Sequence, residues 1–336
     1  MPQIVFQGHN YYRDDKESVL DSLTRHGVPI PSSCRSGICQ SCMMKAVHGQ
    51  PPEQAQRGLG ATQRVQGYFL ACVCTPTGDL EVALPDEDVA ARAMTRVLGK
   101  KPLSRDIMQV LLDCPNGWDY HPGQFIKLHR SDGLIRNYSL ASVPQLNEPL
   151  ELHVHRLPGG QMSEWIHDQL QVGETVEVSA PAGECFYVPG QPHQGLLLIG
   201  TGCGLAPLWG IARDALQQGH SGPIEIFHGS REEGGLYLMD EILEMQGRYS
   251  NVHYTACVSG PDVPEGCAAG RVEQVALAKV PKLAGWRVFL CGHPEMVKLT
   301  KRKTFLAGAA MKEIFSDPFV VMNQACASGN PEKSSH

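Results

Sequence analysis

Short apolar runs in the first part of the chain predict a small sheet with one helix packed against it. Residues 3–7 alternate between apolar and polar side chains, and 11–12 fit the partner strand of a hairpin. Apolar residues in 19–23 have helical spacing, and a glycine and two prolines follow them. Strand patterns at 43–47 and 79–84 complete the predicted sheet.

The middle of the chain changes to a series of short strands. It begins near Ala93, after the acidic stretch 85–88, and turns containing Gly, Pro or Asn separate its strands. Regular short strands of this kind are typical of an antiparallel barrel. The strands are predicted at 107–112, 124–129, 137–141, 150–155 and 175–179.

The last segment, from about His193, alternates apolar strands with helical stretches. Residues 196–200 are a continuous apolar run, as in a buried strand, and the helix 207–216 follows a group of glycines. This alternation is the pattern of a doubly wound parallel sheet. Further strands are predicted at 224–228, 252–258, 287–291 and 314–319.

These patterns predict a multidomain protein of the α+β and α/β classes. A β-grasp-like domain is expected at residues 1–92, an antiparallel β-barrel at 93–190 and a doubly wound domain at 191–327. Residues 328–336 are polar throughout and are expected to form a flexible tail.

Composition narrows the class of function. The 336 residues are 42% hydrophobic and 19% charged, as in a soluble globular protein. A net charge of −6 argues against nucleic acid or an acidic membrane surface as the main partner. No run approaches the length of a membrane span, and no secretory signal is recognised at the start. The 12 cysteines therefore indicate a reducing cytoplasm, and a monomer is compatible with the sequence.

Four cysteines carry the clearest chemical signal. Cys34, Cys39 and Cys42 form a C-x4-C-x2-C loop, and 29 residues separate Cys42 from Cys72. This is the ligand spacing of a plant-type 2Fe–2S cluster, in which two sulfide-bridged irons take four thiolates. Small residues within the loop let backbone N–H groups approach the sulfurs and set the potential. We therefore predict all four cysteines as cluster ligands.

A structural zinc site is the alternative for the same cysteines. Four thiolates also make a tetrahedral zinc centre, but such sites usually come as two separated C-x2-C pairs. Here three ligands share one loop, which favours the iron–sulfur cluster. Because a 2Fe–2S centre carries one electron at a time, another part of the chain should supply electrons.

Two motifs in the barrel segment suggest a flavin. Gly159 and Gly160 open a predicted helix, where free N–H groups and the helix dipole favour a pyrophosphate. Upstream, Arg136 has the chemistry to pair with a phosphate, and Tyr138 has the shape to lie against a flavin ring. Each motif is weak alone.

Their order resembles the flavin barrel of the ferredoxin–NADP reductase superfamily. The shared elements are R-x-Y-S at 136–139, the G-G-x-x-S helix start at 159–163 and the turn 180–183. Members with an amino-terminal ferredoxin generally hold FAD, so the resemblance implies FAD rather than FMN. It implies Tyr138 as a catalytic residue, and flavin contacts from Arg136, Tyr138, Ser139, His153, Val154, Gly160, Gln161, Met162 and Ser163.

A second glycine-rich turn follows the first strand of the parallel sheet. Residues 201–207, T-G-C-G-L-A-P, resemble the nicotinamide-dinucleotide loop of the same superfamily, which would hold a pyrophosphate at the carboxyl edge of the sheet. Glu232 and Glu233 beside a single arginine should disfavour a 2′-phosphate, so NADH is expected rather than NADPH. The implied nucleotide ligands are Thr201, Gly202, Gly204, Pro207, Ser230 and Arg231.

The segment 291–296 resembles the superfamily's C-G-x-P-x-M turn, in which the cysteine lies beside the nicotinamide. The resemblance implies Cys291 as a catalytic residue that also contacts the nucleotide. It places Gly292, Pro294 and Met296 in the same site. The usual residue at position 293 is proline, and we assign His293 no catalytic role.

The last predicted strand ends at Phe319. In related proteins a carboxy-terminal aromatic covers the flavin until the nicotinamide displaces it. Phe319 is either that catalytic lid or an aromatic packed on the sheet edge.

Over its whole length the chain resembles an NADH-dependent, ferredoxin-type reductase of a multicomponent oxygenase. The resemblance implies hydride transfer from NADH to FAD and then single electrons to the 2Fe–2S cluster. The implied acceptor is a Rieske dioxygenase or diiron monooxygenase component, or its ferredoxin, docking near the cluster loop. A reductase for a deoxysugar dehydratase has the same layout and stays open. A non-catalytic redox sensor or zinc-bound interaction module is the alternative from another class.

Overall fold

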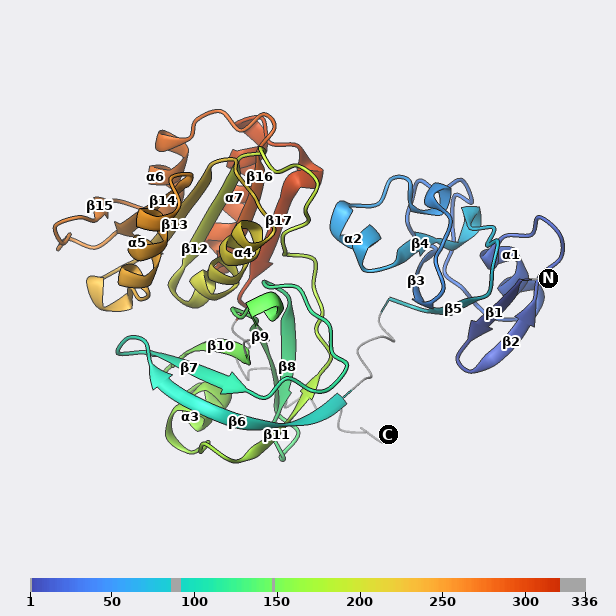
Figure 1. Cartoon of the computed structure of the whole chain (residues 1–336), viewed down its shortest axis with the longest axis horizontal. Coiled ribbons are helices and arrows are strands. Elements are labelled where there is room, and N and C mark those ends of the chain that lie inside the picture. Colours follow the sequence, from blue (N-terminus) through green and yellow to red (C-terminus); the bar gives the residue numbers. More distant parts are fainter. Residues whose placement is uncertain (1, 86–91, 147–148, 321–336) are drawn as a thin grey trace, which may run out of the picture.

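The computed structural model describes residues 2–85, 92–146 and 149–320. Figure 1 shows three units in chain order: a small sheet unit, a barrel, and a larger sheet covered by helices. The predicted tail 328–336 and residues 86–91, which include most of the acidic stretch 85–88, lie outside the described residues. The predicted domain limits stay predictions. No helix in the described ranges is long and apolar enough to cross a membrane.

The first unit is a five-stranded mixed sheet with the strand order β2-β1-β5-β3-β4. β1 and β5 pair in parallel, and the other neighbours are antiparallel. The packed helix α1 begins at Ser18, whose hydroxyl accepts a hydrogen bond from the N–H of Asp21. This is the β-grasp-like arrangement expected from the sequence. The elements are β1 (Gln3–Phe6), β2 (His9–Tyr12), α1 (Val19–Arg25), β3 (Met43–His48), α2 (Ala61–Val65), β4 (Tyr68–Leu70) and β5 (Leu80–Ala83).

The second unit is a six-stranded antiparallel sheet with the order β10-β7-β6-β11-β8-β9. It closes into the predicted barrel through a bridge between Leu140 and Leu152. The long strand β6 is absent from the sequence prediction because its exposed positions carry basic and apolar residues alike. The elements are β6 (Arg92–Pro102), β7 (Ile107–Leu112), β8 (Phe125–His129), β9 (Ile135–Ser139), β10 (Leu150–His155), α3 (Gln161–Asp168) and β11 (Thr175–Ser179).

The third unit is a six-stranded, wholly parallel sheet with the order β15-β14-β13-β12-β16-β17. Strand order reverses on either side of β12, so the sheet is doubly wound, as predicted. The elements are β12 (Leu196–Thr201), α4 (Leu205–Gln217), β13 (Ile224–Ser230), α5 (Met239–Arg248), β14 (Val252–Val258), β15 (Ala268–Ala269), α6 (Val272–Lys279), β16 (Arg287–Gly292), α7 (Pro294–Leu306) and β17 (Ile314–Pro318).

Helices cover both faces of this sheet (Figure 1). On the central strand, Leu196 and Leu198 face the core shared with α4 and α5. Leu197 and Ile199 face the opposite core, shared with α6 and α7. Burial on both faces explains why the sequence of β12 is a continuous apolar run rather than an alternating one.

The barrel and the parallel sheet share one hydrophobic core. Ile107, Cys185 and Tyr187 of the barrel side belong to the same buried cluster as residues of α4. The approach is close at Gly210 of α4, where a Cβ atom would lie 2.8 Å from the carbonyl oxygen of Ala141. These two units therefore pack as one body.

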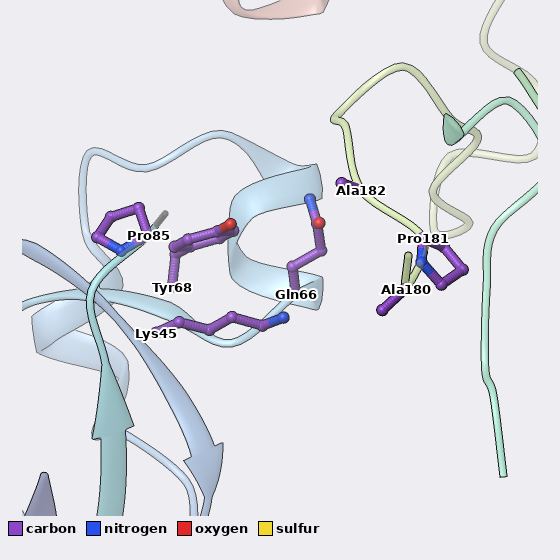
Figure 2. Close-up of a pocket in the computed structure, with 7 residues that line it drawn as sticks. All are labelled: Lys45, Gln66, Tyr68, Pro85, Ala180, Pro181 and Ala182. Atoms are coloured by element: carbon purple, nitrogen blue, oxygen red, sulfur yellow. The ribbon is translucent and has the colours of Figure 1, made fainter. Parts of the chain in front are cut away.

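The first unit keeps a core of its own and meets the barrel through polar groups. Gln63 Nε2 donates to Glu184 Oε1 at 3.0 Å, and Gln124 Nε2 donates to Gln66 Oε1 at 3.3 Å. A narrow cavity of about 30 Å³ lies at this boundary. Figure 2 shows the Lys45 side chain extending toward Ala180. The lining of the cavity comes from Lys45, Gln66, Tyr68 and Pro85 on one side and from Ala180, Pro181 and Ala182 on the other.

Candidate functional site

The four predicted cluster cysteines fall into two pairs. Backbone N–H groups of Cys34 and Cys39 point at each other's sulfurs, at 3.5 and 3.4 Å. The thiols of Cys42 and Cys72 are hydrogen-bonded to each other. Each pair offers two thiolates to one iron, which is the requirement of a binuclear cluster.

The loop is built to hold anionic sulfur. The Ser36 hydroxyl and backbone N–H groups, including that of Ser36 at 3.4 Å, lower the pKa of Cys34 to about 5. Left-handed backbone at Arg35, Gly37 and Gln40 turns successive N–H groups toward the sulfurs. Burial and the neighbouring Cys42 raise the pKa of Cys72 to about 11, so this ligand loses its proton only to a metal.

The same geometry weighs against a structural zinc ion. Among the described residues, no group of three or more His, Cys, Asp or Glu side chains converges on one metal position. A tetrahedral zinc centre needs four donors around a single point. The two-pair arrangement is the one that a binuclear cluster takes, with two thiolates at each iron.

The flavin motif lies on β9, at the rim of the barrel. Tyr138 is partly buried, and burial together with the Cys203 thiol raises the pKa of its phenol. Arg136 is half-exposed, and its guanidinium donates to the carbonyl of Ile135 at 2.7 Å. Within the described ranges Arg136 has no carboxylate partner, so its charge is available to a phosphate. The Ser139 hydroxyl, by contrast, donates a hydrogen bond to the carboxylate of Asp317 on β17.

At the start of α3, the side chain of Ser163 already bonds backbone groups that the motif suggested would be free for a pyrophosphate. Ser163 Oγ accepts from Leu157 N–H and donates to the Gly160 carbonyl, both at 3.1 Å. A Cβ atom on Gly160 would lie 2.5 Å from this hydroxyl, so only glycine fits there. The Ser163 side chain thus holds the loop, and Met162 is buried in the barrel core. Gln161 is exposed, and its carbonyl accepts from Arg130 at 2.8 Å.

His153 and Val154 on β10 point to opposite sides of the barrel wall. Val154 is buried in the barrel core. His153 is hydrogen-bonded on both ring nitrogens, to Glu151 at 2.9 Å and to Tyr237 at 3.0 Å. Their side chains are therefore committed within the protein, and only their backbone groups remain for a flavin.

The nucleotide loop after β12 forms an open backbone cradle. Gly202 has φ +52° and open space around the position that a Cβ would take, whereas a Cβ on Gly204 would lie 2.3 Å from the Cys291 carbonyl oxygen. Thr201 Oγ1 accepts from the N–H of His293 at 2.9 Å. The loop is thereby joined to the turn after β16, and Pro207 is buried in the first turns of α4. Free N–H groups at the start of this helix suit a pyrophosphate.

The residues predicted for the other end of the nucleotide, Ser230 and Arg231, lie at the end of β13. Ser230 Oγ accepts from the N–H of Glu232 at 3.3 Å, and it fills the space where a Cβ on Gly235 would stand. The Arg231 side chain is exposed, and its backbone carbonyl accepts a hydrogen bond from the N–H of Gly260. The position leaves its side chain free to reach solvent or a bound adenosine.

Cys291 lies near the end of β16 in a fully buried position beside the loop of Gly204. Its sulfur lies 3.7 Å from the sulfur of Cys185, and burial raises the pKa of the Cys291 thiol. Gly292 has φ +116°, and a Cβ there would clash with Thr201. Pro294 starts α7, where proline needs no N–H partner.

The Met296 side chain is buried in the core under α7, and the Thr300 hydroxyl donates to its sulfur at 3.5 Å. Its contact with a nucleotide stays a prediction. Phe319 lies beside Gly292, whose carbonyl accepts its N–H at 2.8 Å, and its ring is half-buried. Its role as a flavin lid stays a prediction.

Several residues of the site were not found from the sequence. Asp317 on β17 accepts a hydrogen bond from Ser139. An acidic residue in a largely apolar last strand was the one sequence feature that could have pointed to it. Cys203 lies inside the glycine-rich loop, next to Tyr138, and burial raises its pKa to about 11. Tyr237 has no local motif and reaches the site only through the fold.

Comparison with known families agrees with this geometry. Residues 7–77 match the 2Fe-2S iron-sulfur cluster binding domain, 94–187 the oxidoreductase FAD-binding domain and 198–302 the oxidoreductase NAD-binding domain. The chain is thus an iron–sulfur flavoprotein oxidoreductase with sites for a 2Fe–2S cluster, FAD and NAD.

Individual relatives narrow the class further. The reductase subunit of an aromatic O-demethylase from an Amycolatopsis species is 33% identical, over 84% of this chain and 87% of the relative. The reductase component of the naphthalene 1,2-dioxygenase system of Pseudomonas putida is 28% identical, over 90% and 93%. The crystal structure of the Amycolatopsis cytochrome P450 reductase GcoB matches with a TM-score of 0.66 and 28% identity, covering 95% and 99%.

This chain belongs to the family of ferredoxin-type reductase components of oxygenase systems. The predicted fold class, the 2Fe–2S, FAD and NAD cofactors, and electron transfer from a nicotinamide dinucleotide through the flavin to the cluster are confirmed.

Proposed function

We propose that this reductase delivers single electrons from its cluster to an oxygenase component. The observation that carries the proposal is the paired-thiol loop at an exposed end of the first unit, where Ile38 is 79% exposed between two ligands. The relatives serve dioxygenase and demethylase systems, and one is named a cytochrome P450 reductase. A cytochrome P450 therefore joins the Rieske and diiron acceptors that the sequence implies.

The residues divide the work among three sites. Bound FAD supplies the step between hydride and single-electron transfer. Arg136 would neutralise the flavin phosphate, and Tyr138 would pack against the ring system. The loop 201–207 would hold the dinucleotide pyrophosphate, with Cys291 at the nicotinamide end. Cys34, Cys39, Cys42 and Cys72 would ligate the cluster.

NADH is the proposed electron donor. A 2′-phosphate would meet the exposed Arg231 but also the carboxylates of Glu232 and Glu233. The negative charges of these carboxylates would repel the negative charge of a 2′-phosphate and so oppose its binding. NADPH should therefore bind more weakly through the same pyrophosphate contacts.

The partner would dock over the cluster loop. Ile38 offers an apolar contact beside the ligands, and Arg35 pairs with Asp21 at 2.9 Å on the rim. We further propose a monomer acting in the cytoplasm, where reduced thiols remain available as ligands.

The test is an anaerobic titration with NADH, read as flavin and iron–sulfur absorption. Wild-type protein should lose both sets of bands. Cys72→Ser should lose the iron–sulfur bands and cytochrome c reduction while retaining NADH-dependent ferricyanide reduction, which needs only the flavin. Cys74→Ala is the matched control, because Cys74 is fully buried two residues away. Cytochrome c reduction at the wild-type rate by Cys72→Ser would contradict the path.

A further inference from the structure

Helix α4 contacts the barrel at a residue just after the flavin motif. Ala141 follows the motif 136–139 in the chain and is fully buried. The guanidinium of Arg213, on α4, donates from Nη2 to the Ala141 carbonyl at 2.7 Å. The Ala141 N–H donates to the carbonyl of Glu151 on β10 at 2.9 Å. The segment that follows the flavin motif is therefore held by the barrel on one side and by the helix on the other.

The Arg213 side chain is fixed by two further contacts. Its guanidinium carbon lies 4.6 Å from the centre of the Trp209 ring, and Nη2 lies 3.8 Å from Oε2 of Glu151. The side chain is only 16% exposed. Arginine keeps its proton throughout the pH range of folded proteins, so it is always the donor in these contacts.

Gly210, one turn earlier in α4, shows how closely the helix approaches the same carbonyl. A Cβ atom at this position would lie 2.8 Å from the Ala141 oxygen and 3.0 Å from Cβ of Pro122. The helix backbone therefore covers the carbonyl, and Arg213 supplies its hydrogen bond from the same helix. Without the guanidinium, a covered carbonyl would lose this donor.

A second bond joins the end of β9 to the parallel sheet. Ser139 donates to Asp317 of β17 at 2.8 Å, just before Ala141 in the chain. The two bonds reach different elements, because α4 begins within the nucleotide loop 201–207 and β17 pairs beside Cys291. Two attachments fix both the distance and the angle between the flavin strand and the nucleotide loop, whereas one alone would permit rotation about itself.

We propose that Arg213 is a positioning residue that sets the placement of the flavin strand β9 against the nucleotide loop, through its bond to the Ala141 carbonyl. The inference rests on the flavin and nucleotide sites proposed at 136–139 and 201–207. Hydride transfer needs the nicotinamide and the flavin ring in contact, and a small displacement between the two units would slow it. The nucleotide loop belongs to the parallel-sheet unit alone, so the affinity for the dinucleotide should not change.

Arg213→Met removes the donors and keeps an unbranched side chain over Trp209. We expect the rate of flavin reduction at saturating NADH, measured by anaerobic stopped flow, to fall about tenfold. The Kd of NAD⁺, measured by calorimetry, should stay within about twofold of the wild-type value. Arg213→Lys keeps the charge and a donor, so its rate should recover to within about threefold of the wild type.

Gly210→Ala tests the same contact from the helix side and serves if Arg213→Met fails to fold. The added Cβ would push α4 away from the Ala141 carbonyl, so flavin reduction should again slow while the Kd of NAD⁺ is kept. In both variants the backbone amides of 140–142 should exchange hydrogen faster in the holoprotein, a readout that does not depend on turnover.

Arg287→Met is the matched control. Arg287 also donates to a backbone carbonyl, that of Val188 at 2.8 Å, pairs with Glu313 at 2.8 Å and lies over the ring of Phe315 at 5.8 Å. It is the first residue of β16, at the opposite end of this strand from Cys291 and Gly292. Its loss should lower the thermal midpoint at least as much as Arg213→Met does and leave flavin reduction unchanged.

Three results would overturn the inference. They are an unchanged rate of flavin reduction in Arg213→Met, an equal loss of rate in Arg287→Met, and a Kd of NAD⁺ that rises in step with the loss of rate. Failure of the wild type to reduce its flavin with NADH would instead refute the proposed donor, and it is read from the wild type alone.

Discussion

Ser139 Oγ donates a hydrogen bond to Asp317 Oδ2 at 2.8 Å, across 178 positions of sequence. The bond joins the flavin strand β9 to the last strand of the parallel sheet. Asp317 pairs in register with Cys291, so one carboxyl lies between the flavin motif and the nicotinamide cysteine. Burial raises the pKa of Asp317, and the Ser139 hydroxyl partly offsets this effect.

Asp317→Ala should slow flavin reduction by NADH about tenfold, measured by anaerobic stopped flow. The variant leaves the Ser139 hydroxyl without its acceptor and releases the end of β17 from β9. Asp317→Asn keeps a carbonyl oxygen for Ser139 and should stay within about threefold of the wild type. Equal losses in both variants would show that the charge matters rather than the bond.

Gly204→Ala should abolish most NADH-dependent activity, with kcat/KM falling about a hundredfold. A Cβ at this position would lie 2.3 Å from the Cys291 carbonyl oxygen, and backbone on both sides would have to move. The control is Gly247→Ala in α5, where a Cβ meets no atom within 4 Å. That change should keep activity and stabilise the helix by up to about 1 kcal/mol.

His228 should make the protein less stable in mild acid. Burial lowers its pKa to about 4, whereas an unfolded histidine titrates near 6.5. As pH falls from 6.5 toward 4, only the unfolded state takes up the proton, so stability present above pH 6.5 is lost, by about 2 kcal/mol at pH 5.

The measurement is the thermal midpoint at pH 7.5 and pH 5. The difference between the two should shrink in His228→Gln. It should persist in His253→Gln, which changes an exposed histidine on the neighbouring strand β14. A pH effect of the wild-type size in His228→Gln would remove this histidine as the cause.

Glu184→Ala should slow electron transfer from flavin to cluster severalfold while leaving flavin reduction unchanged. The change removes the acceptor for Gln63 at the polar boundary between the first unit and the barrel. Rapid-scan spectra during NADH reduction separate the two steps. Glu244→Ala is the control, because its partner is Arg248 within α5. Slower flavin reduction in Glu184→Ala would mean a wider disturbance of the barrel.

Replacing Glu232 and Glu233 by lysine should improve use of NADPH about tenfold in kcat/KM. Both carboxylates are exposed beside Arg231, where a 2′-phosphate would lie. Use of NADH should change less than threefold, and added salt should reduce the gain. An equal gain with both nucleotides would place these residues away from the 2′ position.

Local patterns were sufficient for most of the fold. The apolar run of β12 and the loop of Cys34 each carry their signal within a few residues, because strand burial and ligand spacing are local properties. The strand β6 was missed because its exposed positions include Met94 and Leu98 as well as basic residues, so apolar and polar side chains do not alternate along it.

The hydrogen bonds and burial of individual side chains in the site could not be predicted from the sequence. Ser163 has the expected position, but its hydroxyl is hydrogen-bonded to backbone groups of Leu157 and Gly160 in its own loop. Met296 has the expected spacing but is buried in the core. The bond between His153 and Tyr237 joins residues 84 positions apart, and only the packing of the barrel against the sheet brings them together.

The separate cores have a consequence for how this chain can be divided. Ile107 and Tyr187 share a core with α4, so cutting between barrel and parallel sheet would expose a broad apolar face. Among the described residues, the first unit has a separate core of sixteen buried side chains, from Ile4 to Val82. It can therefore be exchanged for another ferredoxin as a module, so that new acceptors are reached by recombination without rebuilding the nucleotide-oxidising half.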